Sequence, residues 1–209
     1  MQLEILKLIN SPVPSNCYII FSENTKNCII VDPGSFSSDI LMSELLNGNL
    51  TPQYIILTHE HFDHIWGCNE LIKNFNPTII CSAACAERII DPKKNLSLFY
   101  DQQGFSVSGN ILLIENLNYS LEWEKNKIDF FISEGHTDAG ICFYFDKNIF
   151  TGDTLIEGEK TVTKLFCGSK KNLLKTIDKI KEFQNNGYEV FPGHGNTFFL
   201  DGYDLNKML

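Results

Sequence analysis

The sequence predicts an α/β chain of the α+β kind, in which two sheets pack on each other with helices outside. Two runs of strand-like segments, each interleaved with helical segments, carry this prediction. A length of 209 residues suits one sizeable domain, and 43% apolar and 21% charged residues suit a packed core.

Hydrophobic periodicity assigns the elements of the first half. Short apolar or alternating runs bounded by turn residues predict strands, at residues 3–9, 17–21, 28–32, 54–58 and 78–82. Longer segments with apolar residues on one side predict helices, at residues 37–48, 64–75, 82–90 and around 96–103.

The second half returns to strands before one long helix. Apolar runs predict strands at residues 111–115, 119–123, 127–133, 141–146, 148–152 and 188–191. The helix falls within a segment, residues 160–181, that holds seven lysines and a single acid. Leu173, Ile177 and Ile180 at helical spacing favour an amphipathic helix whose lysines face solvent. Lys160 and Lys164 precede that helix, and their role stays open between solvation and attraction of an anionic substrate.

Charge and targeting features exclude several classes of protein. A net charge of −9 argues against general binding of nucleic acid or of an anionic membrane. No apolar run approaches the length of roughly 18 residues that a membrane span needs, and the N-terminus reads as a strand without a basic leader. Seven cysteines without a CxxC pair indicate reduced, buried thiols in a cytoplasm.

All five histidines lie at the end of an apolar strand or just past it, beside residues that form turns. Loops held at strand ends by a rigid scaffold are where binding groups concentrate. The segments are "ILTHEHFDH" with His59, His61 and His64, "FISEGHTDAG" with His136, and "VFPGHG" with His194; a further strand end, "IFTGDTL", carries Asp153.

The spacing within "HEHFDH" indicates metal binding. In an extended segment, residues two apart point the same way, so His59 and His61 can share one target while Glu60 and Phe62 point elsewhere. If a helix begins near His64, Asp63 and His64 turn toward a neighbouring point. Imidazole and carboxylate are good ligands for zinc, and imidazole also for iron. The alternative is structural, with capping residues and hydrogen-bonded histidines at loop ends.

These motifs resemble those of the metallo-β-lactamase-fold hydrolases. "THEHFDH" fits the HxHxDH motif of that family, and "GHTDAG", "TGDTL" and "PGHG" follow in the family's order. "NCYII" and "IIVDPG" also resemble its opening strands, so the resemblance covers about residues 5 to 197. It implies a four-layer αββα sandwich with the metals at one edge of the sheets.

The resemblance also implies a site with two divalent metal ions, zinc first, with iron or manganese as alternatives. The implied ligands are His59, His61 and His136 for the first ion, Asp63, His64 and His194 for the second, and Asp153 between both. Asp63 is in addition the implied catalytic residue, since it can orient the attacking water and pass a proton to the leaving group. Asp32 resembles a position that supports the site from behind the ligands, although a turn acid explains it equally well.

Within the fold, the chain looks like the glyoxalase II group, whose members hydrolyse thioesters such as S-D-lactoylglutathione. Two metal ions roughly 3.5–4 Å apart lower the pKa of a shared water toward about 7, which provides a hydroxide for attack on a thioester or ester carbonyl. Aspartate at position 153, where some β-lactamases of the fold carry cysteine, fits that group. The expected partner is a small molecule, possibly an anionic thioester, with no nucleic acid and no membrane.

Two features depart from the glyoxalase II pattern and weaken glutathione as the substrate. The chain ends 15 residues after His194, which leads us to expect a single metallo-β-lactamase-like domain over residues 1–209 without the C-terminal helical domain that binds glutathione. The arginine-containing "GR-x-D" stretch after "TGDTL" is replaced by "IEGEKTVTKLFCGSKKN".

Other activities of the same fold remain open from the sequence. A persulfide dioxygenase holds one iron with two histidines and one aspartate, and those ligand types are present here. A lactonase differs from the first hypothesis only in substrate, whereas a phosphodiesterase or nuclease fits the acidic charge poorly. Di-iron oxygen reductases typically carry glutamate where His61 stands, and a non-catalytic metal module need not retain every ligand. Substrate-binding residues are not assigned, because Tyr18, Phe62, Trp66 and Phe166 fit a cleft or the core.

Overall fold

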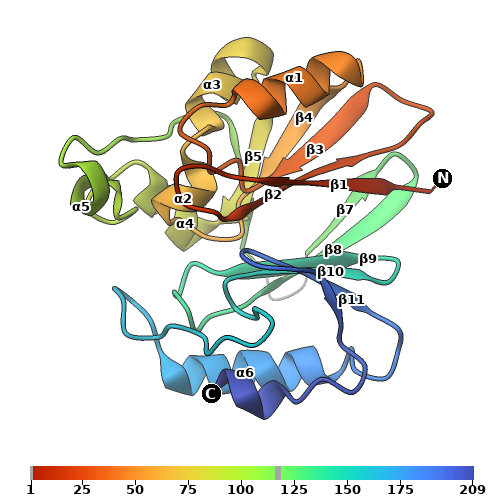
Figure 1. Cartoon of the computed structure of the whole chain (residues 1–209), viewed down its shortest axis with the longest axis vertical. Coiled ribbons are helices and arrows are strands. Elements are labelled where there is room, and N and C mark those ends of the chain that lie inside the picture. The colour runs from red at the N-terminus through yellow and green to blue at the C-terminus, as the bar shows by residue number, and fades with distance from the viewer. Residues whose placement is uncertain (1, 116–118) are drawn as a thin grey trace. The chain divides into compact units, whose positions relative to one another are not determined.

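The chain forms two compact units, residues 1–113 and 114–209, in a computed structural model that describes residues 2–115 and 119–209 (Figure 1). Each unit is built around a six-stranded sheet that carries helices. The predicted combination of two sheets with helices is therefore confirmed, and each unit is described by itself below.

The first sheet has its strands in sequence order from β1 to β6. β1 and β2 pair antiparallel, as do β2 and β3, whereas β3, β4 and β5 run parallel. The strands are β1 Glu4–Ile9, β2 Asn16–Phe21, β3 Asn27–Val31, β4 Thr51–Ile56, β5 Thr78–Ser82 and β6 Ile111–Ile114. Because parallel neighbours end at the same edge, the loops that follow β3 and β4 lie together.

Helices follow the parallel strands β3, β4 and β5, and a parallel pair needs such a crossover connection. They are α1 Asp39–Asn47, α2 Phe62–Ile65, α3 Cys68–Phe75, α4 Ala83–Ile89 and α5 Ser97–Asp101. Leu41 and Leu45 of α1 are buried, as are Cys68 and Leu71 of α3, which leaves the charged residues of both helices toward solvent.

The helix predicted over residues 64–75 is in fact two helices, α2 and α3, which meet at Trp66 and Gly67. The N–H of Gly67 donates to the carbonyl of Pro33 at 2.7 Å and so leaves the helical hydrogen-bond ladder. A Cβ at position 67 would lie 3.0 Å from the same carbonyl oxygen and 2.9 Å from Oγ of Ser38. This close approach was not visible in the hydrophobic pattern, which continues through the break.

The second sheet has the order β12-β11-β10-β9-β8-β7. β7 to β10 form an antiparallel meander, β11 pairs parallel with β10, and β12 pairs antiparallel with β11. The strands are β7 Tyr119–Trp123, β8 Asn126–Ile132, β9 Ile141–Phe145, β10 Asn148–Gly152, β11 Glu189–Pro192 and β12 Phe198–Phe199. β12 and the 3₁₀ helix η1 Leu205–Met208 were not expected from the sequence, because two to four residues show no readable period.

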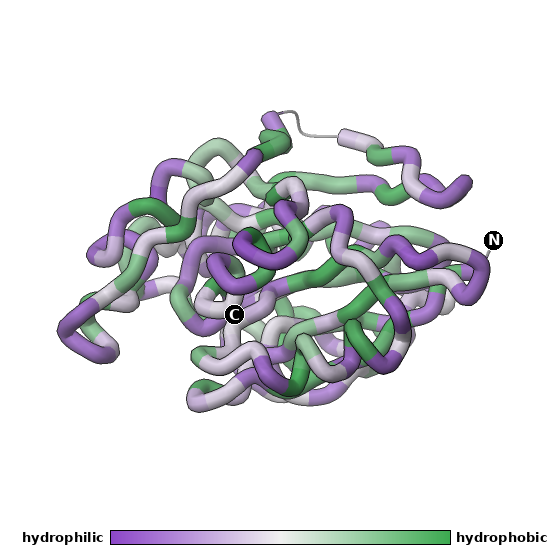
Figure 2. Tube along the Cα trace, turned by 90° about the horizontal axis from the view of Figure 1, so that it is seen from above, coloured by the Kyte–Doolittle hydropathy of each residue, from purple (hydrophilic) through white to green (hydrophobic). Residues whose placement is uncertain are grey.

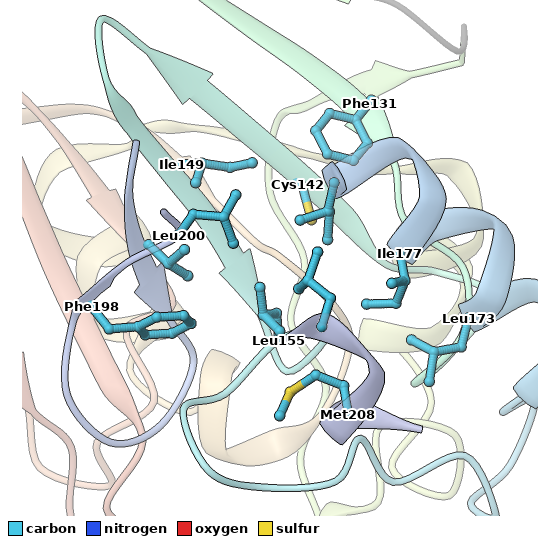
Figure 3. Close-up of a cluster of buried hydrophobic side chains, with 12 residues drawn as sticks. Phe131, Cys142, Ile149, Leu155, Leu173, Ile177, Phe198, Leu200 and Met208 are labelled. Atoms are coloured by element: carbon cyan, nitrogen blue, oxygen red, sulfur yellow. The ribbon is translucent and has the colours of Figure 1, made fainter. Parts of the chain in front are cut away.

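Helix α6, Lys170–Lys181, packs on the second sheet through its apolar stripe. Leu173 and Ile177 of the helix belong to one buried cluster with Cys142 and Ile149 of the sheet, and Met208 of η1 is part of the same cluster (Figure 3). Ser169 caps the helix, accepting a hydrogen bond from the N–H of Asn172 at 3.3 Å. The amphipathic interpretation of this lysine-rich segment therefore holds for the helix itself.

Hydrophobic stretches of the chain are interrupted by hydrophilic ones throughout (Figure 2). Among the helices within the described ranges, none is both long enough and apolar enough to cross a membrane. All seven cysteines are reduced thiols, and all but Cys167 are buried.

Candidate functional site

His59 and His61 bring two ring nitrogens together directly after β4. Nε2 of His59 lies 3.1 Å from Nδ1 of His61, and both side chains are buried. Two ligands bound at 2.0–2.1 Å to one tetrahedral zinc stand about 3.3 Å apart. The spacing of the two nitrogens therefore fits a pair of ligands on one cation, as the HxH spacing predicts.

Asp32 orients two of the histidines, His64 directly and His59 through Thr58. It follows β3, its carboxylate accepts hydrogen bonds from the N–H of Thr58 at 2.8 Å and from the hydroxyl of Thr58 at 2.6 Å, and Nδ1 of His64 lies 3.0 Å from it. Since the Thr58 hydroxyl donates to Asp32, its oxygen can accept from Nδ1 of His59, 3.0 Å away. Both imidazoles are thereby held with Nδ1 protonated and Nε2 available as a ligand.

These hydrogen bonds decide between the two sequence interpretations of Asp32. A turn acid would bond to nearby backbone in its own turn, whereas this carboxylate is buried and reaches residues 26 and 32 positions away. Oδ2 accepts from both the Thr58 hydroxyl and the His64 ring, so Asp32 orients the imidazole of His64 directly and that of His59 through Thr58. Thr58, which completes the relay, was missed by sequence reasoning, although it directly precedes His59.

Asp63 and His64 form a second pair of donors in helix α2. Oδ2 of Asp63 lies 3.6 Å from Nε2 of His64, which is longer than a hydrogen bond and suits two ligands on one ion. The hydroxyl of Ser15 donates to the backbone carbonyl of Asp63. Gly34 passes so close to that carbonyl that a Cβ there would lie 1.6 Å from its oxygen. The position of Asp63 thus depends on the loops after β1 and β3.

The alternate residues of the motif point elsewhere, as predicted. Glu60 is buried and forms an ion pair of 2.9 Å with Arg88 of α4. The ring of Phe62 lies 4.7 Å from that of Tyr100, centroid to centroid. The extended backbone of the HxH segment therefore directs His59 and His61 to one side, and Glu60 and Phe62 to other contacts.

The second unit gathers its three predicted ligands at one edge of its sheet. β8, β10 and β11 run in the same direction, so the loops that follow them emerge together. His136 follows β8, Asp153 follows β10 and His194 follows β11.

Within this group, one carboxylate oxygen faces two imidazoles. Oδ2 of Asp153 lies 3.6 Å from Nε2 of His136 and 3.6 Å from Nε2 of His194. His136 presents Nε2 because its Nδ1 donates to the carbonyl of Val162 at 2.8 Å. An oxygen equidistant from two imidazole nitrogens, beyond hydrogen-bonding distance from both, is compatible with a carboxylate that shares a cation with each imidazole.

A cavity of about 320 Å³ opens beside these three side chains. Its remaining lining residues are Ile156, Glu159, Lys160, Thr161 and Val162. The sequence alone did not distinguish the roles of Lys160 and Lys164. The structure does, since Lys160 borders the cavity and Lys164 does not. An ammonium group beside a candidate metal site favours an anionic group on the ligand.

Each unit therefore brings together the predicted ligands that it contains. His59, His61, Asp63 and His64 gather in the first unit, and His136, Asp153 and His194 gather in the second. Imidazole nitrogens held in a defined tautomer, with carboxylates 3.6 Å away, are the donor set that zinc and iron take in proteins. The residues present fit a metal centre.

Comparison with known proteins gives a family match over most of the chain. The model of the metallo-beta-lactamase superfamily matches residues 10–194. An uncharacterized protein of Mycobacterium bovis is 32% identical over 197 residues, which cover 87% of this chain and 86% of that protein. The crystal structure of BLEG-1, a B3 metallo-beta-lactamase, superposes with a TM-score of 0.86 at 25% identity and covers 94% of each chain.

Two relatives carry names that describe an activity. The probable polyketide biosynthesis zinc-dependent hydrolase BaeB of Bacillus velezensis is 28% identical over 85% of this chain and 72% of its own length. The hydroxyacylglutathione hydrolase of an Enterobacter strain is 29% identical over 84% of this chain, which spans 61% of that enzyme. The fold class predicted from the sequence is confirmed by the family match and the structural likeness.

Proposed function

The chain belongs to the metallo-β-lactamase superfamily, and on this premise we propose that it is a binuclear metal-dependent hydrolase that cleaves thioesters. The observation that carries the proposal is the position of Oδ2 of Asp153, 3.6 Å from Nε2 of both His136 and His194. Such an oxygen can be the shared ligand of a two-ion centre, and the predicted ligand set supplies three further donors for each ion.

The proposal assigns seven ligands to the two ions. His59, His61 and His136 hold the first ion, Asp63, His64 and His194 hold the second, and Asp153 contributes to both. The defined tautomers of His59, His64 and His136 support this assignment, because each presents the nitrogen that a cation takes.

Bound divalent cations would lower the pKa of water and polarise the carbonyl of the substrate. The residues of the chain supply the rest of the reaction. A carboxylate oxygen of Asp63 accepts a proton from the attacking water, whose oxygen bonds to the carbonyl carbon. The C–S bond then breaks, and Asp63 passes the proton to the departing thiolate. Asp32 and Thr58 keep the imidazoles in place throughout, since their hydrogen bonds involve no atom that reacts.

The thioester bond is the finer part of the proposal. The zinc-dependent hydrolase BaeB and hydroxyacylglutathione hydrolase support metal-dependent hydrolysis, and the second name supports a thioester. Because the chain spans only 61% of the Enterobacter enzyme, we propose the bond that is cleaved and not glutathione as the thiol.

The first test is the metal content of protein purified without added metal or chelator, measured by elemental mass spectrometry. About two zinc equivalents per chain, together with hydrolysis of a thioester panel, is the expected result. About one equivalent of iron with oxygen consumption on a persulfide would instead support the dioxygenase alternative. A protein that takes up no metal on reconstitution would overturn both.

Variants test the assignment of the ligands. His59→Ala and His194→Ala should each lower the metal content by about one equivalent and abolish hydrolysis, whereas Lys164→Ala, an exposed lysine away from the cavity, should change neither. Full metal content and activity in both histidine variants would show that the assignment is wrong.

A further inference from the structure

An aromatic cluster lies in the first unit, around Trp66. The centroid of its ring is 5.2 Å from that of Phe36, 5.5 Å from that of Phe62 and 5.5 Å from that of Tyr100. Phe105 stacks on Trp66 at 5.5 Å. We call these five residues the aromatic cluster; they come from the loop after β3, from α2 and its end, and from α5 and the loop after it.

The aromatic cluster is not part of the core. The side chain of Phe36 is 68% exposed and that of Tyr100 is 48% exposed, while Phe62, Trp66 and Phe105 are half-buried. Phe99, on the same short helix as Tyr100, is 74% exposed. Contiguous apolar surface of this kind on a soluble domain marks a site where a ligand or partner binds.

The aromatic cluster is continuous with the metal-ligand segment. Phe62 stands in the chain between His61 and Asp63, so its ring begins one residue away from a predicted ligand on either side. Its N–H donates to the carbonyl of Asn95 at 2.9 Å. The ring of Phe62 points away from the ligand atoms, toward Tyr100, but its backbone adjoins both predicted ligands. A long acyl chain whose reacting bond lies at those ligands can therefore extend onto the aromatic surface.

Buried hydrogen bonds hold this surface in place. Asn95 is fully buried, and its side-chain amide donates to the carbonyl of Phe105 at 2.8 Å. Its side-chain oxygen accepts from the N–H of Ser97, at the start of α5, at 2.9 Å. Asn95 thus links Phe105 and α5 to Phe62 through hydrogen bonds. Buried hydrogen bonds of this kind make the surface rigid, so it is already formed before a ligand binds.

We propose that the aromatic cluster binds the acyl group of the substrate, and that the substrate is a thioester with an extended apolar acyl chain. This inference rests on the proposed thioester hydrolysis and adds the substrate class. A small polar acyl group, such as a hydroxyacyl group of three carbons, leaves most of five aromatic rings uncovered. Burial of each further methylene is worth about a fourfold gain in affinity until the surface is filled.

The first experiment uses the metal-loaded full chain and acyl thioesters of one neutral thiol, N-acetylcysteamine, from acetyl to octanoyl. We expect kcat/KM to rise about two- to fourfold per methylene in the native protein. Trp66→Ala should flatten this dependence, and Trp66→Phe should retain most of it. Phe199→Ala, which removes an aromatic side chain that is 66% exposed in the second unit, is the matched control and should leave the dependence unchanged.

A second measurement reads binding without catalysis. The chain has two tryptophans, and since Trp123 is buried, a Trp123→Phe variant leaves the fluorescence of Trp66 as the signal. The thioether S-octyl-N-acetylcysteamine, which has no carbonyl to hydrolyse, should shift that emission to shorter wavelength with saturation, and the S-methyl compound should not.

The outcomes separate the inference from the proposed function. Hydrolysis without chain-length dependence and without a fluorescence response would overturn the inference and leave the hydrolase standing. Saturable binding of the octyl compound without hydrolysis of any thioester would support the apolar site and overturn the proposed bond. Self-association that Trp66→Ala abolishes, with no response to the octyl compound, would show that a second copy of the chain covers the aromatic cluster.

Discussion

The carboxylate of Asp32 lies 3.0 Å from Nδ1 of His64 and reaches His59 through the hydroxyl of Thr58. One buried acid therefore sets the tautomer of two candidate ligands, one from each end of the HxHxDH segment. Loss of Asp32 should change metal affinity more than the hydrolysis step. Asp32 acts on Nδ1 of each ring, directly or through Thr58, and not on the Nε2 that would bind a cation.

Replacing Asp32 with alanine should weaken metal binding about 10- to 100-fold, the usual cost of losing a partner that orients a ligand. Competition with a chelator of known affinity measures the change. Asp39→Ala, which removes an exposed acid bonded to Ser37, is the control and should have no effect. Asp32→Asn keeps a hydrogen-bond acceptor, so its metal affinity should lie between that of Asp32→Ala and that of the native protein. Equal affinity in the alanine variant and the native protein would contradict this role.

The buried pair of Glu60 and Arg88 should be important for stability. Arg88→Met leaves the carboxylate of Glu60, which is 1% exposed, without its 2.9 Å partner, so we expect unfolding to cost about 3–5 kcal/mol less. The double variant Glu60→Gln with Arg88→Met should recover part of this loss, because no buried charge remains.

Lys181→Met provides the matched control for that pair. It breaks the ion pair with Asp178, an exposed i, i+3 pair on the surface of α6, and should cost less than about 1 kcal/mol. Urea unfolding of the four proteins measures the differences. Similar losses for Arg88→Met and Lys181→Met would show that burial does not matter here.

Gly34 should tolerate no side chain. A Cβ there would lie 1.6 Å from the carbonyl oxygen of Asp63, so Gly34→Ala must displace α2 and with it Asp63 and His64. We expect a loss of roughly 3 kcal/mol or more in unfolding free energy together with lower metal content. Gly109→Ala is the control, since its Cβ would meet side-chain atoms alone, of Ile72 at 3.3 Å and of Ile79 at 3.6 Å. Normal metal content in Gly34→Ala would show that the loop can yield.

The sequence predicted the strands, and the side chains that gather at their ends within each unit, better than it predicted the loops. Apolar runs have a readable period, and the residue types and spacing of His59, His61 and Asp63 indicate metal binding. The break between α2 and α3 was missed because it depends on Pro33, a residue distant in the chain. Lys160 and Lys164 were equivalent in the sequence because both precede the same helix, and only the path of the loop places one at the cavity.

Burial of the thiols makes stability depend on pH in the alkaline range. Burial raises the pKa of Cys28 and of Cys142 from 9.0 to about 12. Between those values the unfolded chain loses the thiol proton and the folded chain keeps it, so the free energy of unfolding falls as pH rises. The slope is about 1.4 kcal/mol per pH unit for each such thiol.

Cys28→Ala should therefore lose less stability between pH 8 and pH 10 than the native protein does, by about 1.4 kcal/mol. Cys167→Ala, which replaces the one half-buried thiol, is the control. Denaturant unfolding at the two pH values gives the slopes, and equal slopes in Cys28→Ala and the native protein would contradict the buried-thiol explanation.

Lys160 should contribute to the recognition of anionic substrates. It borders the cavity beside His136, Asp153 and His194, whereas Lys164 lies four residues further along the same loop and outside the cavity. Lys160→Ala should raise KM for a thioester with a carboxylate on its thiol about 2- to 5-fold, since an ion pair made by an exposed lysine is worth up to about 1 kcal/mol. For the neutral N-acetylcysteamine ester KM should stay unchanged, and so should both values in Lys164→Ala. The comparison of charged and neutral substrates isolates the charge, because a general disturbance of the loop would raise KM for both.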